Sequence, residues 1–130
     1  MSLNAAQAEG IIRKGRAAAE KMGVKVSIAV VDARGDLMAF ARMDGARFTT
    51  VVISQGKALA SAFFGQPSGV LAERAGSPVF QSIIQMNQGR VVFGQGAVPK
   101  TEDGQVVGAV GVSGATSQQD EDVAKAGLAG

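Results

Sequence analysis

Two stretches of the chain hold residues that could bind an anion, and the first surrounds Asp44. Arg42 and Arg47 flank this carboxylate in a polar segment that follows an apolar run. An arginine oriented by a carboxylate can hold a carboxylate or phosphate ligand through two parallel hydrogen bonds. The alternative is an ion pair that only stabilises a turn, since such pairs are common at exposed turns and contribute little. Both interpretations are open from the sequence.

The second stretch is rich in glycine and runs from Gly108 to Thr116. Gly111 and Gly114 would let a ligand approach the backbone closely, and a helix predicted to start at Ser117 would offer it free N–H groups and the positive end of a helix dipole. Ser113 has no histidine to activate it, so its hydroxyl is interpreted as a hydrogen-bond donor or turn former. The alternative is that the glycines only let a strand pack beneath a helix.

Two charged residues on predicted helices are further candidates. Three interpretations of Lys57 are open. It could bind an anion, act as a nucleophilic amine if it is desolvated, or be a solvated side chain on a polar helix face. Asp120 is the first of three consecutive acidic residues, which match the positive end of the last helix. Consecutive carboxylates on a helix point in different directions, so no metal site is predicted here.

Composition excludes several classes of chemistry. The chain of 130 residues is long enough for one domain, predicted as 1–130, and has neither cysteine nor histidine. Acid–base work would therefore fall to Asp, Glu, Lys or a polarised water. The formal net charge is +2 with scattered basic residues, so no nucleic-acid partner is expected. No apolar run is long enough to span a membrane, and a soluble, cytoplasmic protein is expected.

Periodicity and turn signals give the order of elements. The first element is a helix with a stripe of small residues. It is followed by a hairpin that turns at Asp32–Asp36, then by two or three helices, three short strands and a last helix. The predicted helices cover residues 3–22, 50–64 and 68–75, another begins with Ser77 as N-cap and ends before Gly89, and the last begins at Ser117; the predicted strands cover 25–31, 37–43, 90–93, 97–99 and 106–112.

This order predicts an α+β domain in which helices cover a mainly antiparallel sheet of five strands. Pro99 cannot donate to a central ladder, so the strand at 97–99 is expected to be irregular. If the first and last strands pair at the centre, Arg42 at the end of the hairpin lies near Gly114 at the end of the last strand. Arg42, Asp44 and the glycine-rich loop would then surround one cleft.

The sequence resembles the GlcG/HbpS family, which includes the carboxy-terminal domain of PduO-type proteins and is often labelled haem-degrading. The resemblance covers nearly the whole chain and rests on the hairpin 29–46, Ser54 with Lys57-Ala58, and 107–115 followed by 119–121. It implies a profilin-like fold and a homo-oligomer of more than two subunits. It also implies binding of haem, iron or a corrinoid-like molecule. Without histidine, a haem iron would need Met43, Met86, Lys57 or an oxygen ligand, or would sit unligated.

Two functions are therefore expected. The first is a small-molecule binding protein that holds a planar or anionic ligand, haem or corrinoid-like by resemblance, at a cleft between subunits; its predicted site comprises Arg42, Asp44, Lys57, Gly111, Ser113 and Gly114. The second is a catabolic enzyme, such as a lyase, isomerase or deaminase, that acts on a small carboxylate. There Arg42 would hold the carboxylate, and Asp44, Glu73 or Lys57 would move a proton.

Overall fold

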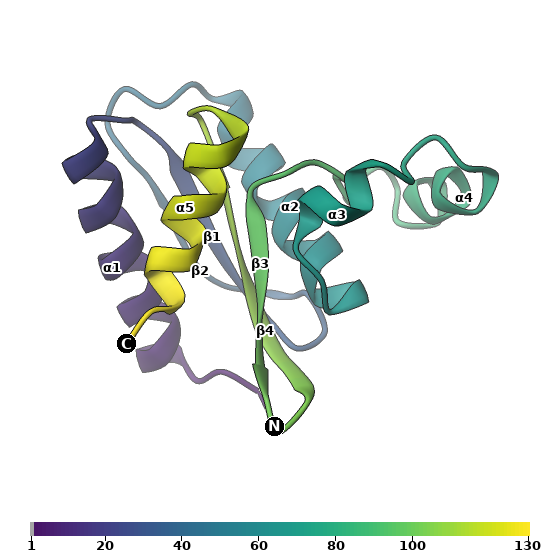
Figure 1. Cartoon of the computed structure of the whole chain (residues 1–130), viewed down its shortest axis with the longest axis horizontal. Helices are drawn as coiled ribbons and strands as arrows, with labels where there is room; N and C mark the ends of the chain where they lie inside the picture. The colour runs from purple at the N-terminus through teal and green to yellow at the C-terminus, as the bar shows by residue number, and fades with distance from the viewer. Residues whose placement is uncertain (1) are drawn as a thin grey trace.

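A single antiparallel sheet separates two helical layers (Figure 1). The computed structural model describes residues 2–130. Helices α1 and α5 cover one face of the sheet, α2 and α3 cover the other, and α4 projects from the body (Figure 1). The elements are α1 (Ala5–Met22), β1 (Ser27–Asp32), β2 (Leu37–Arg42), α2 (Thr49–Phe64), α3 (Ser68–Ala72), α4 (Pro78–Met86), β3 (Ala97–Glu102), β4 (Gln105–Ser113) and α5 (Ser117–Leu128).

The sheet has four strands in the order β2-β1-β4-β3, so the predicted fifth strand at 90–93 is wrong. The N–H of Val92 donates to the carbonyl of Gly56 at 3.1 Å, which places this segment against α2. A Cβ on Gly56 would lie 2.7 Å from the carbonyl oxygen of Arg90. Because Gly56 lacks that atom, the segment 90–93 packs against α2, and it does not pair with a strand of the sheet.

The predicted pairing of the first and last strands is confirmed. β1 and β4 are the central strands and pair antiparallel from Ser27 opposite Ser113 to Asp32 opposite Gly108. β3 is an edge strand, where Pro99 is tolerated because its missing N–H breaks no central ladder. The expected irregularity of this strand is a register shift between Lys100 and Thr101.

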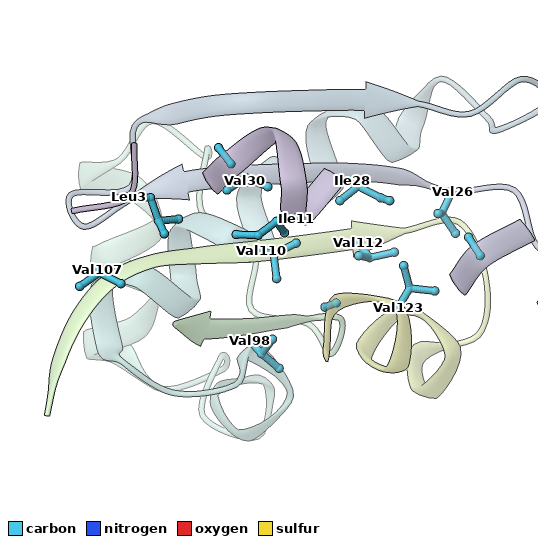
Figure 2. Close-up of a cluster of buried hydrophobic side chains, with 13 residues drawn as sticks. Leu3, Ile11, Val26, Ile28, Val30, Val98, Val107, Val110, Val112 and Val123 are labelled. Carbon is cyan, nitrogen blue, oxygen red and sulfur yellow. The ribbon is translucent and has the colours of Figure 1, made fainter. Parts of the chain in front are cut away.

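The largest apolar core lies between the sheet and the layer formed by α1 and α5. Alternate residues of the central strands, among them Ile28, Val30, Val110 and Val112, are fully buried. Figure 2 shows them close to Ile11 of α1, with Val123 of α5 beside Val112. Because side chains alternate along a strand, the intervening residues point toward α2. Ala29 and Ala109 do so and pack with Ala58 of α2.

The first helix is started and stopped by local signals. Asn4 caps α1 by accepting a hydrogen bond from the N–H of Gln7 at 2.8 Å. The helix therefore begins at Ala5 and not at the predicted Leu3, whose N–H donates to the carbonyl of Val107 at 3.1 Å. The helix ends at Met22, as predicted, because Gly23 adopts the left-handed conformation. These contacts fix α1 across the sheet.

Candidate functional site

The predicted site residues gather at one end of the sheet. The register places Arg42 of β2 opposite Ser27 of β1, and Ser27 opposite Ser113 of β4. The three residues thus form one row across three strands. Lys57 lies at the same end, because its Nζ donates to the carbonyl oxygen of Val112 at 3.0 Å. The predicted proximity of Arg42 and the end of β4 is therefore confirmed.

The side chain of Arg42 is already engaged within its own turn. Its Nε and Nη2 atoms both donate to the carbonyl oxygen of Ala46, at 3.0 and 2.7 Å. Within residues 2–130 neither Arg42 nor Arg47 forms an ion pair with Asp44, which is exposed. Arg42 therefore stabilises the turn, which is one of the two interpretations of this stretch. It does so through hydrogen bonds to a carbonyl group and not through an ion pair.

Gly111 of β4 and Gly114, just after this strand, lie in tight packing contacts. A Cβ on Gly111 would clash with the carbonyl oxygen of Ser54 and lie 2.7 Å from the N atom of Ala58, both in α2. Gly114 has φ of 137°, and a Cβ there would lie 2.5 Å from the carbonyl oxygen of Lys25. The packing interpretation of Gly111 therefore has a direct structural basis.

Several backbone N–H groups near the start of α5 donate to side chains of the same segment. The helix begins at Ser117 as predicted; its N-cap is Thr116, which forms a capping box with Gln119, whereas the sequence pattern suggests Ser117 and Asp120 for these two roles. The N–H of Ala115 donates to Oδ1 of Asp120 at 2.9 Å, and that of Thr116 to Oε1 of Gln119 at 3.2 Å. The N–H of Gln119, in the first turn of the helix, donates to Oγ1 of Thr116 at 3.2 Å, so three of the backbone donors around the predicted anion site are used within the chain.

A buried ion pair joins the two helical layers. Nζ of Lys57 in α2 lies 3.3 Å from Oδ2 of Asp120 in α5, and both residues are buried. A Cβ on Gly96 would lie 2.7 Å from this Nζ, so glycine is needed for the lysine to pass. The solvated interpretation of Lys57 is wrong, because α2 turns this polar position toward small residues of the sheet. Asp120 likewise serves this pair rather than the helix dipole alone.

Burial raises the pKa of the Asp120 carboxyl group above its ordinary value, and this effect exceeds the opposing effects of the Ala115 N–H and of Lys57. The folded protein therefore holds this proton more tightly than the unfolded chain. Through Asp120, stability is gained as the pH falls through the folded pKa, and the gain is complete below the unfolded pKa.

We expect this pH dependence to be visible by comparison with Asp120→Asn, which cannot titrate. As the pH falls through the window between the two pKa values, the free energy of unfolding of the parent should rise relative to that of the variant. Urea denaturation at a series of pH values measures the difference. A parent that loses stability relative to the variant in this window would show that pairing outweighs desolvation.

A well-formed hollow lies elsewhere, at the opposite end of the hairpin. A cleft of about 390 Å³ is bounded by the hairpin turn, the outer face of α2 and the segment that follows α4. We call it the apolar cleft; its lining includes Val31, Gly35, Asp36, Leu37, Val52, Gln55, Leu59, Gly89, Arg90 and Val92. None of the predicted site residues Arg42, Asp44, Lys57, Gly111, Ser113 and Gly114 is among these.

Sequence reasoning missed this cleft because three distant segments form it. The sequence pattern places Val52 on the buried face of its helix, but its side chain is 68% exposed at the cleft. Phe48, one turn earlier, is 76% exposed, and Leu37 at the cleft is 50% exposed. An exposed apolar patch beside a hollow is a feature of ligand or protein interaction sites.

Residues 2–130 contain no helix with the length and apolar character needed to cross a membrane. They also contain no group of three or more acidic side chains placed to hold a metal ion. Glu73 follows α3 and is exposed. Of the methionines considered as iron ligands, Met43 packs against the core and Met86 on α4 is 83% exposed.

The fold and its buried residues define an α+β domain in which an antiparallel sheet of four strands is flanked by helices on both faces. Residues 3–129 match the model of the family described as haem degrading protein HbpS-like, and the chain belongs to that family. The resemblance found in the sequence is thereby confirmed.

Individual relatives agree with this assignment. Protein GlcG of Escherichia coli strain K12 is 38% identical over 119 residues, covering 85% of this chain and 81% of GlcG. The structure of ORFY from Klebsiella pneumoniae is 29% identical with a TM-score of 0.88, covering 97% of this chain and 88% of ORFY. A double mutant of Streptomyces reticuli HbpS is 32% identical with a TM-score of 0.86, covering 98% of this chain and 85% of that chain.

Proposed function

We propose that this protein binds a small planar or anionic molecule in the apolar cleft. The observation that carries the proposal is the hollow of about 390 Å³ itself, a volume within the range of small-molecule sites. Family membership supports the choice of ligand, since the family description refers to haem. The proposed ligand is therefore a porphyrin or a similar flat molecule with acidic groups.

The chemistry of the cleft suits a flat apolar body with an acidic edge. Val31, Leu37, Val52, Leu59 and Val92 supply the apolar surface. Arg90 also lines the cleft; its Nε donates to the carbonyl oxygen of Asn87 at 3.3 Å, and its terminal nitrogens have no acceptor among residues 2–130. A carboxylate of the ligand would pair with this guanidinium group through two hydrogen bonds.

The residues present do not fit a haem iron. The lining contains no histidine, cysteine, methionine or tyrosine, the side chains that hold haem iron in proteins. Lys57 is engaged by Asp120 and Val112. The porphyrin would therefore be recognised through its flat face and acidic groups, without a bond from this cleft to the metal.

A second copy of the chain would complete the site. Val52, which lines the cleft, and Phe48, one turn earlier, are both exposed, and this favours cover by another protein surface. Val79 and Met86 are exposed on the projecting helix α4 (Figure 1), at 67% and 83%. We therefore propose that copies of the chain assemble over this face, which places the ligand at a subunit interface.

The test compares haemin with metal-free protoporphyrin IX in absorbance titrations. Both should bind with dissociation constants that agree to within about threefold, because the iron has no protein ligand. Arg90→Ala should weaken both by about tenfold or more, the value of a charge-assisted hydrogen bond. Binding of haemin alone, with the metal-free compound inert, would contradict the proposal.

Two further variants test whether binding depends on this cleft. Arg16→Ala removes an exposed arginine from α1, on the opposite face of the sheet, and should leave both affinities unchanged. Val52→Asp places a charge on the apolar wall and should weaken porphyrin binding. Sedimentation of the same variant should also show a smaller assembly than the parent, because Val52 lies on the proposed interface.

One observation favours the second function, an enzyme that acts on a small carboxylate. Lys57 and Asp120 form a buried pair with a perturbed carboxyl pKa, a feature enriched at catalytic sites. Neither residue lines the apolar cleft, however. The pair is explained by its contacts between α2, β4 and α5, and binding is the function that we favour.

A further inference from the structure

A second hollow lies in the other helical layer, between α1, the end of α5 and β3. Its volume is about 310 Å³, and we call it the basic groove. Leu3, Ile11 and Leu128 supply its apolar surface, and Leu3 and Ile11 are each 5% exposed. The groove shares no lining residue with the apolar cleft.

Three cationic side chains, from Arg13 and Lys14 of α1 and Lys100 of β3, line the same groove. Among residues 2–130 the ion pairs are Lys57 with Asp120 and Lys125 with Glu121, so none of the three is neutralised by a carboxylate. Nζ of Lys14 donates to the carbonyl oxygen of Ala129 at 2.7 Å and keeps further donors. Like charges gathered in one hollow repel each other, and an anion there would relieve the repulsion.

The register of the sheet explains why Lys100 joins the cations of α1. Lys100 pairs with Gly108 of β4. A Cβ on Gly108 would clash with the side chain of Leu3, which places this pair on the α1 face. The lysine therefore lies at the rim of the hollow, next to its apolar surface.

Two glycines shape the hollow. Gly127 of α5 packs closely on α1, since a Cβ there would lie 3.0 Å from Cγ2 of Ile11. Gly10 of α1 faces open space, where an added Cβ would meet only Nη2 of Arg13, at 3.6 Å. The first glycine closes the floor of the groove and the second leaves room above it.

We propose that the basic groove binds a small amphiphilic anion. Its carboxylate or phosphate group would lie among Arg13, Lys14 and Lys100, and its short apolar part would cover Leu3, Ile11 and Leu128. The combination of a cationic rim and an apolar floor in one hollow recognises both halves of such a molecule. This site is independent of the porphyrin site proposed above.

The test uses hexanoate, hexyl phosphate and neutral hexanol as probes, followed by backbone amide NMR of the full chain. Hexanoate or hexyl phosphate should shift the resonances of Gln7, Gly10, Lys14 and Lys100, and hexanol should bind at least about tenfold more weakly. A preference for one anion identifies the head group. Equal binding of hexanol would overturn the proposal, because the cations would then contribute nothing.

Variants locate the binding. Lys100→Ala should weaken the preferred anion about three- to tenfold, and Gly10→Leu should abolish binding by filling the groove. Gly10→Leu should not lower the melting temperature, because glycine is the poorer helix former. Lys21→Ala, an exposed lysine of α1 outside the groove, and Arg90→Ala in the apolar cleft should leave the affinity unchanged. Loss of binding in Arg90→Ala with none in Lys100→Ala would overturn the proposal.

Discussion

Breaking the buried pair between α2 and α5 should cost more stability when one partner is removed than when both are. Lys57→Met leaves the Asp120 carboxylate buried without its cation, and Asp120→Asn leaves the Lys57 ammonium buried without its anion. Each single variant should lose about 3–5 kcal/mol of unfolding free energy, because an uncompensated buried charge remains. Asparagine keeps an acceptor for the N–H of Ala115, which isolates the effect of charge.

The double variant should lose less than the sum of the two single losses, by at least about 1 kcal/mol. Urea denaturation of the four proteins at neutral pH gives the coupling energy directly. Lys125→Met with Glu121→Gln is the matched control. This pair at 3.1 Å has an exposed lysine and should be worth less than about 1 kcal/mol. Strict additivity at the buried pair would mean that Lys57 and Asp120 stabilise the fold separately.

Gly111→Val should destabilise the protein severely. The added Cβ would clash with the backbone of α2 at Ser54 and Ala58, where the helix cannot withdraw without losing its contact with the centre of the sheet. We expect a loss of at least about 3 kcal/mol, or failure to fold. Thermal and urea unfolding measure it.

Gly76→Val is the control for this substitution. Nothing lies within 4 Å of a Cβ at Gly76, so this variant should remain within about 1 kcal/mol of the parent. If Gly111→Val folds as stably as Gly76→Val, the contact between β4 and α2 is looser than described, and a ligand-binding role for Gly111 becomes the better account of the glycine.

The sequence predicted the elements whose signals are local. The hairpin, the caps near Ser77 and Gly23 and the central pairing of β1 with β4 all follow from turn residues and alternation over a few positions. The segment at 90–93 was misassigned because a short apolar run fits either a strand or an extended chain packed on a helix. Only the contact with Gly56 distinguishes the two.

The candidate site was harder to predict because its decisive features are contacts between distant residues. Lys57 has the sequence context of a polar helix face, and its burial depends on Asp120, 63 positions later. Arg42 could serve a ligand until its bonds to Ala46 are known. The apolar cleft has no motif, since its walls come from β2, α2 and the segment after α4.

The most direct test of the proposed function is to locate a bound porphyrin by amide NMR with metal-free protoporphyrin IX. The apolar cleft predicts that the resonances of Gly35, Leu37, Val52 and Val92 shift on titration, while those at the other end of the sheet stay in place. Shifts confined to Arg42, Asp44, Ser113 and Gly114 would contradict this location and return the site to the end of the sheet where the sequence first placed it.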